Sequence, residues 1–291
     1  MNSGDDIREN QQERERCLRD DILDVKEIDW DHVWRSRLAR SSSTRRDARF
    51  WNGRASSFAK SSTEKAFADQ FLAIMKPETH WHVLDMGCGS GALAIPMAKR
   101  VSHVTAVDFS DAMLNQVHRQ CADEKIRNIT TVLGRWEDDW EELGIETCDV
   151  AVASRSLMID DLRTCILKCN EIARKRVYIV TVAGDGPHNR RIFDAVGRPF
   201  VPNPDYIYNY NMLYQMGIYA NVAFIEEKRV RTYRDADDAI ASMRWMFDEL
   251  NDREEAKLAA FFQKHFVFRD GSWRLPHDTV IRWAVIWWEK K

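Results

Sequence analysis

The feature that most constrains the fold of this 291-residue chain is a glycine-rich turn between two apolar segments. The segment 82–86 precedes the turn Gly87-Cys88-Gly89-Ser90-Gly91, and a helical stretch and the segment 104–108 follow it. A strand, a glycine turn, a helix and a second strand ending in an acid together build a cofactor-binding edge in a parallel sheet. Glycines let such a turn approach a ligand without an intervening Cβ. We therefore expect 82–86 to be the first strand of a parallel sheet.

Two kinds of cofactor fit this turn, and Asp85 distinguishes them. Gly87, Gly89 and Ala92 also satisfy the dinucleotide fingerprint. However, a carboxylate two residues before the first glycine would repel a pyrophosphate in a poorly solvated cleft. S-adenosylmethionine has no phosphate, and its sulfonium and ammonium groups would be attracted by Asp85. Asp108 ends the next strand 19 residues after Gly89, close to the distance of about 20 at which an acid reaches ribose hydroxyls.

The pattern Asp85-x-Gly87-x-Gly89-x-Gly91, followed by the segment 106–110, resembles the class I S-adenosylmethionine-dependent methyltransferases. The resemblance covers roughly residues 50–182, and the remainder is more loosely similar to small-molecule enzymes of the ubiquinone-biosynthesis type. It implies an α/β fold: a Rossmann-like, doubly wound, seven-stranded mixed sheet with an antiparallel last strand and an N-terminal helical cap. It also implies S-adenosyl-L-methionine as the cofactor. The residues expected to bind it are Asp85, Gly87, Cys88, Gly89, Gly91, Asp108, Phe109, Met113, Trp136, Glu137, Ser154 and Arg54.

Two elements of the family pattern depart from its usual form. After the third expected strand, 128–134, Arg135 stands where the family commonly has an Asp that holds the adenine. Trp136 could stack on the adenine and Glu137 could accept from its amine, or Trp136 could be a packing residue. In the cap element 50–55, Asn52 replaces the usual Asp. Arg54 could pair with the methionine carboxylate or be a surface charge.

The acceptor side of the site is expected where the later strands end, because ligands of open parallel sheets lie beyond the carboxyl ends of the strands. The strand 148–153 ends in Ser154-Arg155-Ser156, where Arg155 could bind an anionic substrate or a serine could cap the helix 159–173. His188 is the best-placed histidine for general-base work, although a lone loop histidine is commonly a surface residue. Four tyrosines lie within 205–217, on a pocket wall or on a packed helix. The candidate substrate residues are Trp51, Arg155, Ser156, His188, Tyr206, Tyr210 and Tyr214, and no spacing assigns a catalytic base.

Patterning divides the chain into three parts: a charged N-terminal segment at 1–28, a helical cap at 29–75 and a methyltransferase domain at 76–291 with inserted substrate-side helices at about 188–217. Strands are expected at 176–182, 221–233 and 280–288, with charged helices between the last two.

Composition narrows the class of protein. A net charge of −3 argues against a dedicated polyanion binder. No apolar run approaches 18 residues and the acidic start is unlike a signal peptide, so we expect a cytoplasmic protein with no membrane partner. The six cysteines lack the spacing and companions of a metal site, so no metal is expected.

The sequence thus predicts methyl transfer to a small organic acceptor, with homodimerisation left open. One alternative is an RNA methyltransferase, because 35–65 holds nine basic residues against two acids. Another is a catalytically silent, cofactor-binding regulatory protein. A dehydrogenase is disfavoured by the charge of Asp85.

Overall fold

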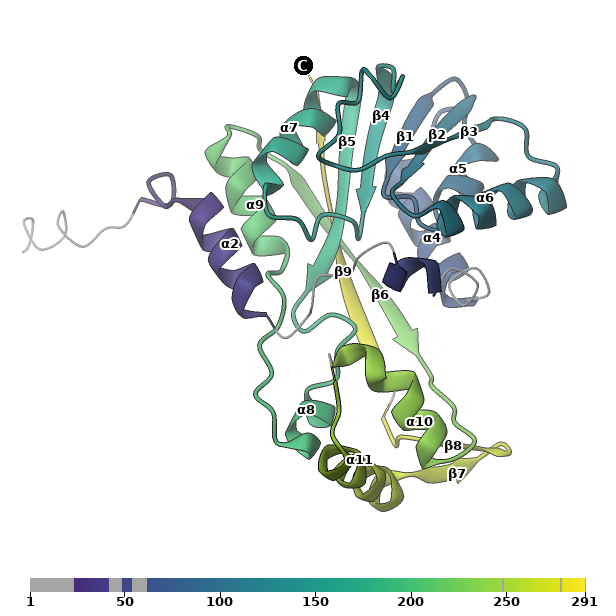
Figure 1. The fold of residues 1–291 in the computed structure, drawn as a ribbon. Helices are drawn as coiled ribbons and strands as arrows, with labels where there is room; N and C mark the ends of the chain where they lie inside the picture. The colour runs from purple at the N-terminus through teal and green to yellow at the C-terminus, as the bar shows by residue number, and fades with distance from the viewer. Residues whose placement is uncertain (1–23, 42–48, 54–61, 248, 278, 291) are drawn as a thin grey trace, which may run out of the picture.

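The computed structural model describes residues 24–41, 49–53, 62–247, 249–277 and 279–290. Within these residues, one sheet of seven strands has the order β3-β2-β1-β4-β5-β9-β6 (Figure 1). Its strands are β1 (His82–Met86), β2 (His103–Asp108), β3 (Ile129–Leu133), β4 (Cys148–Ser154), β5 (Ala173–Ala183), β6 (Asn221–Arg229) and β9 (Thr279–Glu289). β1 to β5 run parallel, and β9 is antiparallel to both neighbours. The predicted seven-stranded mixed sheet with an antiparallel last strand is confirmed.

Helices cover both faces of this sheet, as a doubly wound fold requires. The helices are α2 (Trp30–Arg40), α4 (Ser62–Met75), α5 (Ala94–Ala98), α6 (Asp111–Glu124), α7 (Leu162–Ile172), α8 (Arg190–Val196), α9 (Tyr206–Gln215), α10 (Ala236–Met243), the 3-10 turn η1 (Arg244–Met246) and α11 (Asp252–His265). α4, α5 and α6 contribute to the core on one face. α2, α7 and α9 contribute to the core on the other face.

The predicted N-terminal cap is divided between different places in the structure. α2 lies with α7 and α9 on one face of the sheet. Its Trp34 indole donates to the carbonyl of Ile159 at 2.7 Å. α4 packs on the opposite face of the sheet, against β6. The short helical segment 49–53 lies near the carboxyl ends of the strands, and its contact with the glycine turn region is described below.

A separate hydrophobic cluster forms beyond the end of β5, in the part of the molecule that we call the distal lobe: α8, α10, η1, α11 and the hairpin of β7 (Val267–Arg269) and β8 (Ser272–Arg274). α8 packs on α11, which packs on α10 (Figure 1). Its core contains the fully buried Leu258 and Phe262. The two helices found within 188–217 therefore separate, because α8 joins this lobe whereas α9 packs on α2 and the sheet.

Two predicted elements end or begin at a different residue in the structure, and one hairpin is additional. The strand expected at 221–233 ends at Arg229, and Tyr233 instead bridges to Trp273 in the distal lobe. The helix expected from Ile159 begins at Leu162, because the side chain of Asp161 accepts from the backbone of Thr164 and caps it. The β7–β8 hairpin was not predicted. Its turn, Asp270-Gly271, has positive φ at both residues, which is the geometry that an Asp-Gly pair favours.

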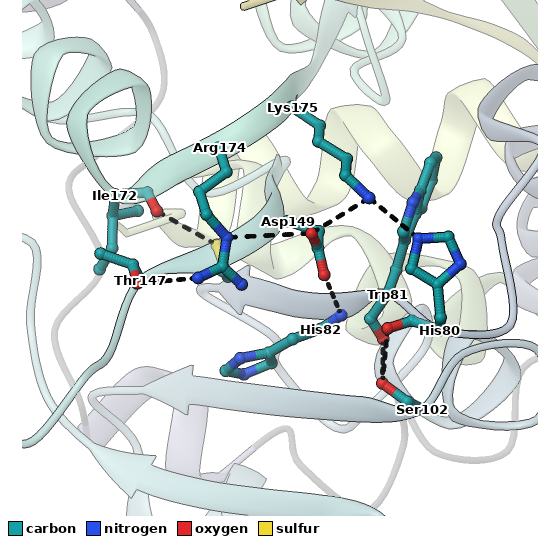
Figure 2. Close-up of polar contacts among 10 residues, drawn as sticks. His80, Trp81, His82, Ser102, Thr147, Asp149, Ile172, Arg174 and Lys175 are labelled. Atoms are coloured by element: carbon teal, nitrogen blue, oxygen red, sulfur yellow. Dashed lines mark hydrogen bonds and ion pairs between the residues drawn. The ribbon is translucent and has the colours of Figure 1, made fainter.

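A polar network fixes the amino ends of the central strands (Figure 2). Asp149, near the start of β4, accepts from the backbone N–H of His82 at 2.9 Å, and its other oxygen lies 3.3 Å from the Lys175 ammonium on β5. Arg174 and His80 extend the network on either side. These contacts tie β1, β4 and β5 together at the end of the sheet opposite the glycine turn. The network therefore stabilises the strands whose opposite ends carry the glycine turn.

Candidate functional site

The glycine turn follows β1 directly and is held against the end of β2. The backbone N–H groups of Gly87 and Cys88 donate to the carbonyl of Val107 at 2.8 and 2.9 Å. Gly87 has φ +77°, and a Cβ built on it would lie 2.3 Å from the Cβ of Ser156. Gly89 also has positive φ, but a Cβ there would meet no atom within 4 Å. The turn is thus closed on the side of Ser156 and open above Gly89.

Two buried carboxylates flank this turn. Asp85 is 1% exposed, one oxygen accepts from the backbone of Ala94, and Oδ2 has no hydrogen-bond partner among the described residues. Burial, with a contribution from the Asp108 carboxylate, raises the pKa of Asp85 to about 7, while Arg155 opposes this shift. An acid with an unused oxygen in an apolar setting is costly for the folded chain alone, so it indicates a cationic or hydrogen-bonding ligand.

Asp108 is fixed by the turn itself. Its Oδ2 accepts from the N–H of Gly89 at 2.8 Å and its Oδ1 from the N–H of Ser110 at 2.9 Å. Burial raises the pKa of Asp108, and the hydrogen bonds from Ser110, Gly89 and Phe109 limit the rise. The structure therefore brings the predicted Asp85, glycine turn and Asp108 together as one site.

The other predicted cofactor residues near the turn have different surroundings. The Cys88 thiol is buried, and burial raises its pKa well above the usual value, which favours the neutral thiol. Met113 is buried in the first turn of α6, and its N–H donates to the Ser110 hydroxyl at 3.2 Å. The Phe109 ring lies 5.2 Å from the Arg135 guanidinium. Arg135, which replaces the family's Asp, thus covers an aromatic ring here.

Trp136 and Glu137 differ in how far they are exposed to solvent. Trp136 is 7% exposed, and its ring centroid lies 5.7 Å from that of Trp140 within the core on the α7 side. Lys168 donates to the carbonyl of Trp136 at 2.8 Å. Glu137 is exposed. These contacts favour packing for Trp136, so its stacking on an adenine and the role of Glu137 stay predictions.

The loop after β4 crosses the glycine turn. The Ser156 hydroxyl donates to the carbonyl of Met86 at 2.8 Å. Arg155 has φ +59°, and its N–H donates to the carbonyl of Val180 at 2.8 Å. The hydroxyl of Ser154 is buried and has no hydrogen-bond partner among the described residues. Ser156 therefore positions the turn, and its predicted contact with substrate stays untested.

Arg155 is held by a carboxylate that the sequence did not single out. Its guanidinium forms two hydrogen bonds with Glu64 of α4, at 3.0 and 2.7 Å. The same group lies over the rings of Phe67 and Trp283, 4.6 and 5.4 Å from their centroids. The predicted substrate anion would thus compete with Glu64 for Arg155. The only signal for this pair was a positive charge following a strand, which does not identify its partner on a distant helix.

The segment 49–53 contacts the site through Asn52. Its Oδ1 accepts from the hydroxyl of Ser110 at 2.6 Å, so this short helix is anchored at the start of α6 beside Asp108. Phe50 and Trp51 pack edge to face, with centroids 5.2 Å apart. Trp51 thus lies on a segment that reaches the site. Arg54 lies outside the described residues.

The remaining predicted substrate residues lie away from the turn. His188 is buried among Phe193, Phe200 and Trp245 of the distal lobe, so it is not the surface residue of the alternative interpretation, and its role as a general base stays a prediction. The three tyrosines predicted to contact substrate lie on α9. Tyr206 packs on Phe224 of β6, Tyr210 donates to the carbonyl of Ala220, and Tyr214 packs on Tyr219. These contacts agree with the packed-helix interpretation.

The donor set of the turn fits S-adenosylmethionine. Oδ2 of Asp85, which is unpaired among the described residues, offers a carboxylate oxygen to a cationic group. Gly89 leaves open space, and Asp108 ends β2 beside the turn. A pyrophosphate would face two carboxylates. Among the described residues no group of three or more His, Cys, Asp and Glu side chains gathers as a metal site. None of the described helices combines the length and the apolar character needed to cross a membrane.

Comparisons with known proteins agree with this geometry. Residues 83–176 match the family described as a methyltransferase domain. An uncharacterized protein of Haemophilus influenzae is 34% identical over 241 residues, covering 82% of this chain and 88% of that protein. The ubiquinone/menaquinone biosynthesis C-methyltransferase UbiE of Zymomonas mobilis is 32% identical over 66 residues, which are 23% of this chain and 27% of that protein.

Two solved structures resemble the fold. A candidate methyltransferase from Bacillus halodurans has a TM-score of 0.53 at 14% identity, covering 77% of this chain and 98% of that one. The YcgJ protein of Bacillus subtilis has a TM-score of 0.51 at 13% identity, covering 77% and 97%. At these identities the likeness concerns the fold.

Proposed function

Because this chain belongs to the class I S-adenosylmethionine-dependent methyltransferases, we propose that it transfers a methyl group to a small organic acceptor at the carboxyl edge of its sheet. S-adenosyl-L-methionine is its cofactor. The observation that carries the proposal is the buried carboxylate of Asp85, whose Oδ2 has no hydrogen-bond partner in the described part of the chain and lies beside an open glycine turn. A protein that binds no ligand here would gain nothing from keeping this destabilising group.

The bound cofactor supplies a methyl group on a sulfonium, which is a good leaving group. The residues of the chain then bind, orient and exclude water. Asp85 and Asp108 present carboxylates on either side of the turn, and Ser156 holds the turn by its bond to Met86. Asn52 anchors a covering segment on Ser110. Alignment of acceptor and methyl group in a site shielded from water supplies most of what this reaction needs.

A small acceptor is favoured over RNA because the described basic residues of 35–65 are divided among α2, the segment 49–53 and α4, and α2 and α4 lie on opposite faces of the sheet. Arg35, Arg37 and Arg40 lie on α2, which packs on α7 and α9 in the helical layer. Arg45, Arg46, Arg54 and Lys60 lie outside the described residues. A cytoplasmic location and a homodimer stay predictions.

Calorimetric titration tests the cofactor part of the proposal. The protein should bind S-adenosylhomocysteine and not NAD. Asp108→Ala should lose this binding, since it removes the carboxylate that accepts from Gly89 and Ser110. Asp123→Ala, an exposed aspartate on α6, is the matched control and should bind normally. Binding of NAD, or no binding of the homocysteine nucleoside, contradicts the assignment.

Transfer of a labelled methyl group tests the acceptor. Pools of small organic acids, phenols, amines and thiols should yield labelled product, whereas total cellular RNA should not. Labelling of RNA alone, by a preparation that binds the cofactor, would replace the small acceptor with a nucleic acid.

A further inference from the structure

Arg155 lies in a largely buried cluster of side chains between α4, the loop after β4 and β9. Both terminal nitrogens of its guanidinium donate to the carboxylate of Glu64, and the guanidinium lies over the rings of Phe67 and Trp283. The Trp283 indole donates in turn to Glu227 of β6 at 2.8 Å. The side chains of Arg155 and Glu64 are 20% and 11% exposed. An acceptor would have to displace Glu64 to bind this guanidinium, which is therefore poorly placed to hold a substrate.

The side chain of Asp85 lies on the same side of the sheet as this cluster. Val83, two residues before Asp85, belongs with Phe67 to the core on the α4 side, and side chains two residues apart on a strand share a face. Asp85 is in register with Val152 of β4, three residues before Arg155. The loop that carries Arg155 then crosses the glycine turn through its hydrogen bond to the end of β1. Asp85 and Arg155 are thus neighbours at the ends of two adjacent strands.

The charges that face Asp85 come from several elements. Burial and the carboxylate of Asp108 on β2 raise the pKa of Asp85 to about 7, whereas the guanidinium of Arg155 acts in the opposite direction. The thiol of Cys88 in the turn is neutral, because burial raises its pKa. α5 brings no charged side chain and contributes the backbone N–H of Ala94. Among these surroundings, within the described part of the chain, Arg155 supplies the positive charge.

We propose that Arg155 is a positioning residue for the cofactor: oriented by Glu64, its charge keeps Asp85 in the carboxylate form that the ammonium group of the cofactor binds. The inference rests on the proposed function, because it concerns the cofactor site of that reaction. An arginine suits this role, since its guanidinium stays charged at every pH near neutrality. Glu64 fixes where this charge lies and also cancels part of it. The charge of Arg155 nevertheless prevails at Asp85, where its effect favours the carboxylate.

This arrangement predicts shifts of opposite sign for the two members of the ion pair. Removing the charge of Arg155 leaves the negative charge of Glu64 uncompensated, so Asp85 should lose its proton at higher pH. Removing the charge of Glu64 leaves Arg155 uncompensated, so Asp85 should lose its proton at lower pH. A role of the pair in packing alone would disturb the site in the same direction in both variants.

Two measurements follow the Asp85 carboxylate, one of them without any ligand. Carbon-13 NMR of the full chain, labelled at its aspartate carboxyl carbons, titrates Asp85 in the free protein, and Asp85→Asn identifies its resonance. Calorimetry gives the affinity for S-adenosylhomocysteine between pH 6 and pH 8. The titration midpoint of the free protein and the midpoint of the affinity profile should move together from variant to variant.

The variants change charge with little change of shape. Arg155→Met should raise both midpoints and weaken S-adenosylhomocysteine binding at pH 7 about fivefold, since a rise of about one unit leaves roughly a tenth of Asp85 ionised instead of half. Arg155→Lys, which keeps the charge, should stay close to the parent. Glu64→Gln should lower both midpoints and bind at pH 7 at least as tightly as the parent.

Arg198→Met is the matched control. Arg198 of the distal lobe also donates twice to a carboxylate, that of Glu254, at 2.6 and 2.7 Å, and it also lies over an aromatic ring, that of Phe247. Its replacement removes the same kind of ion pair far from the glycine turn. Both midpoints should remain those of the parent.

The possible results separate this inference from the proposed function. The inference is overturned if Arg155→Met leaves the Asp85 midpoint unchanged, or if Arg155→Met and Glu64→Gln shift it in the same direction. If Arg155→Met does not fold, the direction of the shift in Glu64→Gln decides. If the midpoints of the free protein shift as expected but S-adenosylhomocysteine binds none of the proteins, the proposed function fails and the electrostatic link between Arg155 and Asp85 stands.

Discussion

The position of the Asp85 carboxylate is unfavourable in the free protein but suited to binding a cation. Burial and the charge of Asp108 raise its pKa to about 7. The folded chain therefore keeps a proton that the unfolded chain releases near pH 4. As pH rises from about 4 to about 7, this group progressively lowers the free energy of unfolding. Above about pH 7 the loss of stability is complete, because the buried carboxylate is then ionised. A bound cation offsets that penalty.

Cofactor binding should consequently depend on pH. S-adenosylhomocysteine carries an ammonium group, which favours the ionised carboxylate, so its affinity should rise about tenfold between pH 6 and pH 8 as Asp85 loses its proton. Calorimetry in buffers of different ionisation enthalpy should detect proton release at pH 6 and little at pH 8. In Asp85→Asn the affinity should be low and independent of pH. An equal pH dependence in that variant would assign the proton to another group.

The contact between Gly87 and Ser156 gives a second prediction at this scale. Gly87→Ala should destabilise the protein by about 2–4 kcal/mol, because positive φ and the close Cβ of Ser156 both oppose a side chain. Gly144→Ala is the matched control, with φ +68° and no atom within 4 Å, and should cost about 1 kcal/mol. Thermal unfolding measures both.

A second substitution tests the cause. Ser156→Gly removes the atoms nearest to the new methyl group, so it should recover about 1–3 kcal/mol in the Gly87→Ala background. Strictly additive effects of the two substitutions would exclude the contact as the source of the strain.

How much of the site the sequence could predict depends on the range of the interactions. Asp85, the glycines and Asp108 form a local pattern, and the structure brings them together as expected. His188 resembles a loop residue in sequence, but rings brought from α8 and η1 bury it. The pairing of Arg155 with Glu64 joins residues 91 positions apart, which no local pattern encodes.

Among the secondary-structure elements, α4 has a role beyond covering the sheet. Its Glu64 side chain is 11% exposed and holds the 20% exposed Arg155 of the loop after β4. Because that loop crosses the glycine turn, α4 indirectly fixes one wall of the cofactor site.

Removing the ion pair between Glu64 and Arg155 should destabilise the protein. Glu64→Ala leaves the Arg155 guanidinium largely buried over Phe67 without its partner, so the free energy of unfolding should fall by about 2–4 kcal/mol. Urea unfolding measures the loss. Glu124→Ala, which breaks the exposed pair with Lys99, is the control and should change stability by about 0.5 kcal/mol at most. Equal losses in both variants would mean that Arg155 finds another partner.

Strands and helices were predictable to different degrees for a physical reason. β1, β2 and β4 are buried on both faces and read as continuous apolar runs, so their bounds agree closely with expectation. The end of β6 depends on where Tyr233 packs, which only the folded lobe decides. The Asp270-Gly271 pair is a sequence signal for the short β7–β8 hairpin, which was not predicted.

For the whole molecule, the distal lobe has its own hydrophobic core, so it should unfold separately from the sheet. Phe262→Ala, in α11, should cost about 3–5 kcal/mol in the lobe. Hydrogen exchange should then accelerate in α8, α10 and α11 but not in β1 or β4, and S-adenosylhomocysteine should still bind.

Phe71→Ala provides the matched comparison, because Phe71 is as buried as Phe262 but packs in the core next to the sheet. It should accelerate exchange in the central strands and weaken S-adenosylhomocysteine binding. Uniform acceleration over both regions in either variant would mean that the lobe and the sheet unfold together.

The register of β6 and β9 has a consequence for how such a chain can change in length. Arg229 ends β6 directly opposite Thr279, which begins β9, so the chain leaves the sheet and returns to it at paired positions. Whatever connects these two residues, a tight turn or a lobe, starts and finishes at the same two points. Closing a longer connection adds entropy cost only slowly with length. Insertions and deletions there can therefore accumulate without shifting any strand that carries the glycine turn.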